Sequence, residues 1–308
     1  MPVSEAISPA GISSFFELCD KDARGTALTD PSKVGARGGG FALKRGVKSR
    51  VQTRRSVKTK ISIRINSKPS PEANTTRWAI ERLLEKAKTP LDVRVEVQTS
   101  VPIASGFGSS AAGTAASCLA LADAESLPVT FTELGRITHV AEVLNQTGLG
   151  TAAALFVGGF VLVTEPGAPG IGSVDRLLFP KEHAVLCVHF GSMPTREALS
   201  KLDLASRVNP AAQTAMKQIR SNPNLQTFLN AARRFSRETG LDSARVAKVI
   251  DSLLSAGAVG AAQNMIGDAV HAVVEGAGAD QIARRVRTKF PSARVFISEL
   301  DERGVRLS

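Results

Sequence analysis

Alternating apolar and polar residues over the first hundred positions predict a strand-rich region with little helix. The expected strands cover residues 41–43, 47–53, 58–66 and 91–99, the last of which (LDVRVEVQT) alternates without interruption. Residues 72–88 instead have helical spacing, with an apolar stripe at Trp78, Ile80, Leu83 and Leu84. The pattern therefore predicts a β-rich region with packed helices.

After residue 99 the sequence predicts a turn of small residues, followed by a helix to about residue 122. A capping box of Thr130 and Glu133 begins another predicted helix, which reaches about residue 146. Glycines at 148–150 lead into apolar residues 155–164, which we interpret as a buried strand. Residues 165–173, rich in proline and glycine, mark the expected boundary between two lobes of the chain.

The rest of the chain predicts a mainly helical lobe. We expect a strand at 183–190, amphipathic helices between about residues 196 and 289, and a last strand at 294–298. The predicted class is α+β with two lobes, residues 1–168 and residues 169–308.

The composition is that of an ordinary globular protein, with 43% hydrophobic and 22% charged residues. The apolar run 152–163 is too short to span a bilayer, and residues 1–11 lack the pattern of a secretory signal. Three widely spaced cysteines, Cys19, Cys118 and Cys187, fit neither a disulfide framework nor a zinc site. We therefore expect a cytoplasmic protein without membrane contact.

The net charge of +11 is concentrated in residues 44–60, which carry eight cations and no acid. Such a segment can attract nucleic acid or an anionic substrate. We favour a solvated outer face of neighbouring strands, with Val47, Val51 and Val57 pointing inward. The chain has no tyrosine and one tryptophan, so nucleic acid is not the expected partner.

The strongest candidate for chemistry is the segment 106–112, GFGSSAA, between a strand and a helix. Glycines allow a tight backbone path, and free N–H groups at a helix start attract anions. Because residues 97–122 carry no charge, no acid competes for that helix end. Tight packing of the helix in a core would explain the small residues equally well.

Other phosphate sites and catalytic motifs do not fit the sequence. It contains no GxxxxGK[ST], GxSxG or HExxH. Gly106, Gly108 and Ala111 satisfy a relaxed dinucleotide fingerprint, but the acids Asp123 and Glu125 end the same helix, which is the wrong place for a Rossmann fold.

The run from Pro102 to Ala112, PIASGFGSSAA, resembles the second motif of the GHMP kinases, PxxxGLGSSAA. The resemblance implies ATP as cosubstrate and a two-lobed α+β fold, with a ribosomal-protein-like N-terminal lobe and a helical, ferredoxin-like C-terminal lobe. It implies that the nucleotide contacts Pro102, Ser105, Gly106, Phe107, Gly108, Ser109, Ser110 and Ala111. It also implies that Ser110 and Glu142 bind Mg²⁺.

A narrower resemblance, to the archaeal pantoate kinases, covers most of the chain. It rests on residues 8–17 (SPAGISSFFE), 35–40 (GARGGG), 147–150 (TGLG), 265–267 (MIG) and 296–305 (FISELDERGV). It implies transfer of the ATP γ-phosphoryl group to the 4-hydroxyl of (R)-pantoate for coenzyme A biosynthesis. A homodimer is what the family suggests.

Three residues are candidates for binding that substrate. Arg37, among glycines, is a bidentate donor suited to a carboxylate. Ser13 and Ser14 lie where the family's first motif faces the substrate. Glu142 could alternatively be a solvated helix acid, and Arg37 a surface residue.

The sequence departs from the family pattern at two positions. Thr151 stands where many GHMP kinases have a catalytic aspartate, and Pro9-Ala10-Gly11 replaces Pro-Gly-His. We place Thr151 and Ser110 at the catalytic position. Because threonine cannot accept a proton as a carboxylate does, catalysis would rest on positioning and electrostatics, or on another acid. Other hypotheses are a homoserine- or mevalonate-type kinase and a non-catalytic RNA-binding or structural homologue.

Overall fold

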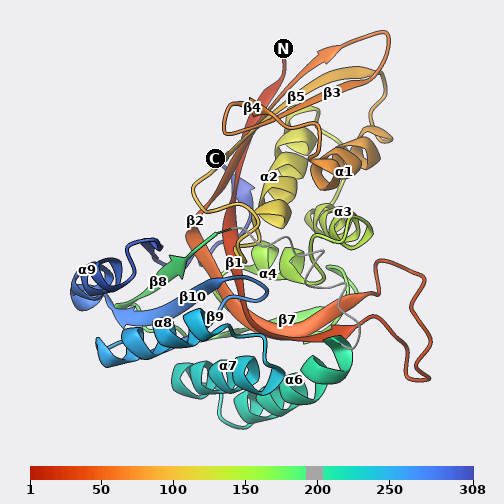
Figure 1. The fold of residues 1–308 in the computed structure, drawn as a ribbon. Coiled ribbons are helices and arrows are strands. Elements are labelled where there is room, and N and C mark those ends of the chain that lie inside the picture. Colours follow the sequence, from red (N-terminus) through yellow and green to blue (C-terminus); the bar gives the residue numbers. More distant parts are fainter. Residues whose placement is uncertain (192–203) are drawn as a thin grey trace.

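The computed structural model describes residues 1–191 and 204–308 and places their strands in two sheets (Figure 1). The larger sheet has eight strands: β1 (Val3–Cys19), β2 (Gly35–Arg55), β3 (Lys60–Ile65), β4 (Lys68–Pro69), β5 (Leu91–Thr99), β6 (Phe160–Glu165), β7 (Ser173–Leu177) and β12 (Arg306–Leu307). The smaller has four: β8 (His183–His189), β9 (Gly260–Gln263), β10 (Ala269–Glu275) and β11 (Arg294–Ser298).

The helices fall into three groups around these sheets. The first group lies at the end of the larger sheet where both chain termini lie, and it consists of α1 (Asn74–Leu84), α2 (Ser109–Ala124) and α3 (Phe131–Leu144), with α4 (Thr151–Val157) below them (Figure 1). At the other end are α6 (Leu204–Ser221) and α7 (Leu225–Thr239). Beside the smaller sheet lie α8 (Ala244–Ser255) and α9 (Ala279–Lys289). None of the helices described here is long and apolar enough to cross a membrane.

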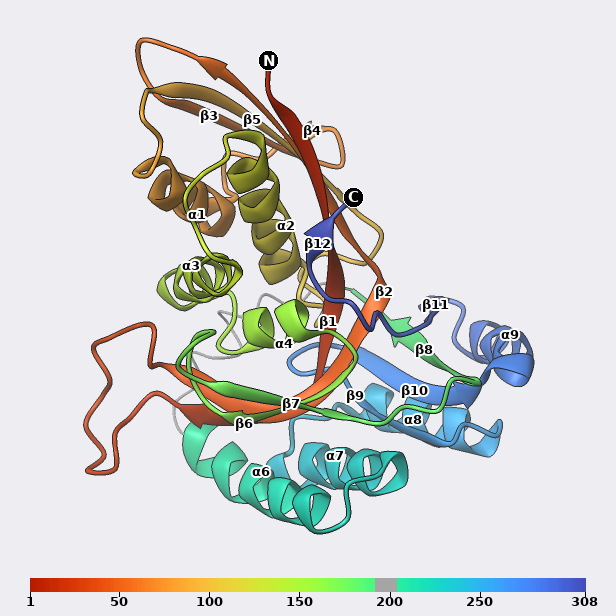
Figure 2. The same ribbon diagram turned by 180° about the vertical axis from the view of Figure 1, so that it is seen from behind.

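The long hairpin of β1 and β2 belongs to two layers of the fold (Figure 2). β2 pairs with β1 along its length, but it pairs with β5 only over residues 47–55 and with β6 only over residues 38–41. Both α2 and α4 contact β1 at the junction between the two layers. The hairpin thereby brings residues from distant parts of the chain to one place.

Two buried clusters hold these layers together. Between α2 and the part of the larger sheet formed by β2 and β5, small side chains such as Ala112 and Ala115 pack against Val47, Val51 and Val95. Under the lower part of the hairpin, the rings of Phe41, Phe160 and Phe228 lie with centroids 4.6–5.6 Å apart. The alanine-rich face of α2 therefore packs in the core, as the packing interpretation required, while its first residues border a cavity.

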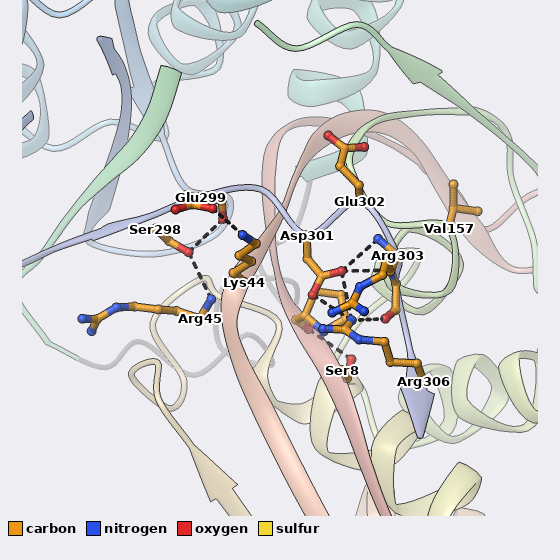
Figure 3. A network of polar contacts seen from close by, with 12 residues as sticks. Ser8, Lys44, Arg45, Val157, Ser298, Glu299, Asp301, Glu302, Arg303 and Arg306 are labelled. Atoms are coloured by element: carbon orange, nitrogen blue, oxygen red, sulfur yellow. Dashed lines mark hydrogen bonds and ion pairs between the residues drawn. The ribbon is translucent and has the colours of Figure 1, made fainter. Parts of the chain in front are cut away.

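The last residues of the chain return to the junction (Figure 3). Asp301, which is buried, accepts hydrogen bonds from the backbone N–H groups of Arg303 and Gly304 and from Nη1 of Arg306. The N–H of Gly159 donates to the Asp301 carbonyl at 2.7 Å, which ties this turn to the end of α4. The lobe boundary at residue 168 stays a prediction. The strands on its two sides, β6 and β7, pair with each other in the larger sheet.

The pattern identified several elements correctly. β5 covers residues 91–99 as predicted, and the strands predicted at 183–190 and 294–298 are β8 and β11. The Thr130 side chain accepts a hydrogen bond from the Glu133 N–H at the start of α3. β1 was not predicted. The predicted strands 41–43 and 47–53 belong to one strand, β2.

Other expectations were wrong. Residues 155–157 end helix α4 rather than begin a strand, and the strands β9 and β10 interrupt the predicted helical series. The first part of that series, residues 196–203, lies outside the described residues. Val57 is 93% exposed rather than inward, whereas Val47 and Val51 are buried as expected.

Candidate active site

A cavity of about 880 Å³ lies at the junction of the two layers. Its wall includes residues of the strands β1 to β6, the start of α1, the segments 103–110 and 145–151, and residues 265–266. This volume suits a small-molecule site rather than a flat interface. The wall contains most of the residues that the sequence singled out.

The loop before α2 is shaped by two glycines. Gly106 and Gly108 have φ angles of 77° and 59°, in the left-handed region that favours glycine. An added Cβ at Gly106 would lie 3.1 Å from Cβ of Asn264. At Gly108 it would lie 2.8 Å from Cγ2 of Thr151. Both backbone conformation and close neighbours therefore require glycine here.

Helix α2 begins at Ser109 and points its start at the cavity. Its N-cap, Gly108, offers no capping side chain, and its first turn contains no acid. The first N–H groups of a helix have no acceptor within the helix. Ser109 and Ser110 both line the cavity, so their uncapped amides form a site suited to phosphate.

Phe107 anchors the loop between these glycines. Its side chain is 1% exposed and packs against Phe296, with ring centroids 5.3 Å apart. Its carbonyl accepts a hydrogen bond from the Gly11 N–H at 3.0 Å. The aromatic ring thus fixes the loop from the core side.

Glu142 lies buried beside Ser110. Its carboxylate accepts hydrogen bonds from the hydroxyl groups of Thr147, at 3.1 Å, and Ser110. Burial raises the pKa of Glu142 to about 7, although both hydrogen bonds act in the opposite direction. The alternative of a solvated helix acid is therefore wrong. The Ser110 hydroxyl and the Glu142 carboxylate are oxygen donors of the kind that Mg²⁺ prefers.

Thr151 is the first residue of α4 and lies against the loop before α2. Its Cγ2 would be 2.8 Å from a Cβ on Gly108 and 3.0 Å from one on Gly11. Thr151 also lines the cavity. The Thr151 side chain, a hydroxyl and a methyl group, therefore lies beside the loop before α2.

The three candidates for substrate binding occupy different places. Arg37 and Ser13 line the cavity. Ser14 is fully buried, is not part of the wall, and its Oγ lies 2.9 Å from Nε2 of His271. Arg37 is not simply a surface residue, because it forms a bidentate ion pair with Glu17.

Of the predicted nucleotide contacts, Ser105 lines the cavity, whereas Pro102 and Ala111 do not. Ser105 lines the cavity, and its hydroxyl donates to the carbonyls of Ile103 and Gly191 at 3.1 Å. Pro102 and Ala111 are not among the lining residues. Their side chains therefore contribute to the shape of the loop and to helix packing.

The loop between β9 and β10, which contains the MIG segment 265–267, also borders the site. The Met265 N–H donates to the Ser13 carbonyl at 2.7 Å. Gly267, the last residue of the MIG segment, lies against the backbone of Ser105.

A buried polar bridge supports that loop. Nδ1 of His271 lies 2.9 Å from Oδ1 of Asn264, and its Nε2 faces the Ser14 hydroxyl. Burial lowers the pKa of His271 to about 3, which keeps the ring neutral. The bridge connects β1 to Asn264, which contacts Gly106. Only the neighbouring sequence MIG pointed to this region.

Comparison with known proteins identifies the family. The profile of the GHMP kinases N terminal domain matches residues 74–159. The pantoate kinase of Thermococcus kodakarensis is 30% identical over 256 residues, 81% of each chain. The chain belongs to the pantoate kinase family of GHMP kinases. The pantoate kinase of Methanocaldococcus jannaschii is 26% identical over 269 residues, 86% of this chain and 91% of the relative.

Solved structures show the same fold. A phosphotransferase related to the CoA biosynthesis pathway has a TM-score of 0.89 and 24% identity, covering 99% of this chain and 98% of that one. Homoserine kinase from Cytophaga hutchinsonii has a TM-score of 0.71 and 19% identity, covering 100% and 98%. The predicted α+β GHMP kinase fold is confirmed, and the family makes the chain an ATP-dependent small-molecule kinase.

Proposed function

We propose that this kinase transfers the γ-phosphoryl group of ATP to the 4-hydroxyl of (R)-pantoate, a step in coenzyme A biosynthesis. The curated relatives, at 26–30% identity over most of their length, are pantoate kinases. The observation that carries the proposal is that an uncapped helix start and an arginine line one cavity. Such a cavity suits a triphosphate and a small hydroxy acid.

In this proposal the phosphates lie on the loop before α2. The amides of Gly108, Ser109 and Ser110 donate hydrogen bonds to phosphate oxygens, and the dipole of α2 favours their charge. Ser110 and Glu142 would hold Mg²⁺. The ion, when bound, neutralises phosphate charge, and it also favours the ionised form of Glu142.

The substrate would lie between the phosphate loop and β6. Arg37 would bind its carboxylate, and Ser13 would border it. Val161 and Val163 line the same cavity and offer an apolar surface to the two methyl groups of pantoate. A charged end and a branched apolar centre would thus meet matching parts of the wall.

Transfer would depend on alignment and charge neutralisation. The 4-hydroxyl oxygen forms a bond to the γ-phosphorus as the bond to the β–γ bridging oxygen breaks, and its proton passes to a phosphoryl oxygen or to solvent. Thr151 has no carboxylate to take that proton. It would instead border the acceptor hydroxyl, while the amides of α2 stabilise the developing charge.

A substrate panel tests the proposal. ADP release is measured with (R)-pantoate, homoserine and mevalonate, each with Mg²⁺ and with excess EDTA, and the product is identified by mass. We expect turnover of pantoate only in the presence of Mg²⁺. Turnover of homoserine or mevalonate without turnover of pantoate would reject it.

Nucleic-acid binding has less support. Several cations of the basic segment are paired: Lys48 with Glu5 at 2.6 Å, Arg54 with Asp92 at 3.3 Å, and Lys44 with Glu299. These pairs agree with the solvated strand face favoured by the sequence. The ATP site, by contrast, has a shaped cavity.

A further inference from the structure

An ion pair forms part of the cavity wall at the substrate end. Arg37 and Glu17 are direct cross-strand partners on β2 and β1. Nε of Arg37 donates to Oε2 of Glu17, and Nη2 donates to Oε1, both at 2.8 Å. The Glu17 side chain is 7% exposed, whereas that of Arg37 is 34% exposed and lines the cavity. The acid is thus buried behind the cation.

This geometry occupies only one edge of the guanidinium group. A guanidinium has five N–H donors, and the edge formed by Nε and Nη2 is separate from the end formed by Nη1 and Nη2. The Cys19 thiol and the Glu165 carboxylate also interact with the guanidinium group. Because neither hydrogen bond to Glu17 uses Nη1, the end formed by Nη1 and Nη2 can bind a second carboxylate while the first edge remains on Glu17.

Glu17 is itself held by helix α6. Nε2 of Gln213 donates to Oε1 of Glu17 at 2.8 Å. One turn earlier, Oδ1 of Asn209 accepts from the Leu18 N–H at 2.8 Å, and its Nδ2 donates to the Leu18 carbonyl at 3.0 Å. Three hydrogen bonds from one face of α6 thereby fix the end of β1, including the carboxylate that holds Arg37.

Few other cations in the described part of the chain line the cavity and could bind a substrate carboxylate. Among the lining residues of the described chain, the cations are Arg37 and Lys68. Lys68 lies on β4, at the edge of the larger sheet, next to lining residues of α1. Arg37 pairs with Glu17, and Ser13, three residue pairs further along the hairpin, pairs with Gly40; Arg37 and Ser13 both line the cavity at the end assigned to the substrate.

We propose that Glu17, supported by Gln213, is a positioning residue that orients the free end of Arg37 toward the carboxylate of the substrate. The inference rests on the proposed function, because it assumes that a carboxylate-bearing hydroxy acid is the acceptor. A fixed guanidinium loses less rotamer freedom when the substrate binds. It also favours a planar carboxylate over a neutral amide, which cannot form two charge-assisted hydrogen bonds.

Two effects oppose each other at Glu17, and the experiment decides between them. The Glu17 carboxylate orients Arg37, but it also repels a second carboxylate nearby. If orientation dominates, Glu17→Gln raises the KM for pantoate about tenfold or more, since an oriented ion pair is lost. If repulsion dominates, the same variant lowers that KM. The sign of the change therefore tests the inference.

The test compares Glu17→Gln with Glu5→Gln, which removes another β1 acid that pairs across to β2, with Lys48, outside the cavity. The KM for pantoate and for ATP, kcat and the melting temperature are measured. We expect only Glu17→Gln to raise the KM for pantoate, with the KM for ATP and kcat within about threefold of wild type. An unchanged or lowered KM for pantoate would overturn the inference.

A second variant covers the case in which Glu17→Gln fails to fold. Gln213 is exposed, so Gln213→Ala should fold, and the adjacent exposed Thr214→Ala is its control. We expect Gln213→Ala to raise the KM for pantoate about threefold, as expected for loss of one hydrogen bond. Equal KM values for Gln213→Ala and Thr214→Ala would contradict the support from α6.

Comparison of acid and amide substrates separates this inference from the proposed function. The ratio of kcat/KM for pantoate to that for its amide should fall about tenfold or more in Glu17→Gln and in Arg37→Ala. A wild-type enzyme that does not use pantoate rejects the function, and the ratio is then measured with the hydroxy acid that it does use. An unchanged ratio in Glu17→Gln rejects the inference while the function stands.

Discussion

Replacing Gly108 by alanine tests the close contact between the phosphate loop and Thr151. Gly108 has a φ of 59°, and an added Cβ would lie 2.8 Å from Cγ2 of Thr151 and 3.2 Å from the carbonyl oxygen of Gly11. The backbone conformation alone disfavours alanine by about 1–2 kcal/mol. Steric overlap in a packed region adds roughly 1–3 kcal/mol.

A compensating change removes the nearest of these contacts. Thr151→Ser deletes Cγ2 and keeps the hydroxyl, so the added Cβ would then meet backbone atoms of Gly11, the carbonyl oxygen at 3.2 Å and the nitrogen at 3.4 Å. The double variant should recover about 1 kcal/mol of the loss, which is a favourable coupling between the two positions. It should not recover the part that comes from the positive φ.

Urea unfolding of the four proteins in the cycle measures this coupling, and ADP release measures the KM for ATP. We expect Gly108→Ala to raise the KM for ATP about tenfold or more. Gly113→Ala is the matched control, because Gly113 lies within α2 and its added Cβ would lie 3.6 Å from Cγ1 of Val97 on β5, an ordinary contact. Gly113→Ala should leave stability unchanged or raise it by about 0.5–1 kcal/mol. Additive effects of Gly108→Ala and Thr151→Ser, within about 0.5 kcal/mol, would refute the placement of Thr151.

Three further predictions concern the buried bridge, the C-terminal turn and the metal ligands. His271 has a pKa of about 3 in the folded chain and an ordinary value of 6.5 when unfolded, so the unfolded state takes up the proton first as pH falls below 6.5. The loss of unfolding free energy between pH 7.5 and 5.0 should be about 2 kcal/mol smaller in His271→Gln than in wild type, measured by urea unfolding; equal losses would contradict the neutral bridge. Asp301→Ala should lower the unfolding free energy by about 2–4 kcal/mol, because it leaves Arg306 and two backbone N–H groups without their acceptor, whereas the exposed Glu302→Ala should change it by less than about 0.5 kcal/mol. Ser110→Ala should lower kcat/KM in the ADP-release assay about a hundredfold and raise the Mg²⁺ concentration needed for half-maximal rate, and wild-type values for both would reject Ser110 as a metal and phosphate ligand.

Local patterns predicted the elements whose burial differs between two faces. β5 alternates buried and exposed residues along its length, so its sequence identifies it directly. β10 is buried at six successive positions, and a short apolar run of this kind cannot be distinguished from a buried helix by periodicity. The same ambiguity affected residues 155–157 of α4, which precede a true strand.

At the site, too, the sequence predicted features of contiguous residues and not contacts between distant ones. The turn before α2 was predictable because its glycines and small residues are contiguous in the sequence. The partner of Arg37 was not, since Glu17 lies twenty positions away and meets it only through the register of β1 and β2. Successive strand residues point to opposite faces, so Ser13 and Ser14 could be separated only once β1 was known to be a strand.

Asn264 was missed for a related reason. It lies far from the phosphate loop in the sequence and reaches Gly106 only because β9 and β10 place their connecting loop there. No helical or strand pattern signals such a contact. Tertiary structure, and not local propensity, decides which loops meet at the cavity.

A crystal structure with a non-hydrolysable ATP analogue and Mg²⁺ tests the central claim most directly. We expect phosphate oxygens within hydrogen-bonding distance of the amides of Gly108, Ser109 and Ser110, with the metal between Ser110 and Glu142. An analogue bound elsewhere, or a cavity in which the protein's own side chains occupy the start of α2, would contradict the account.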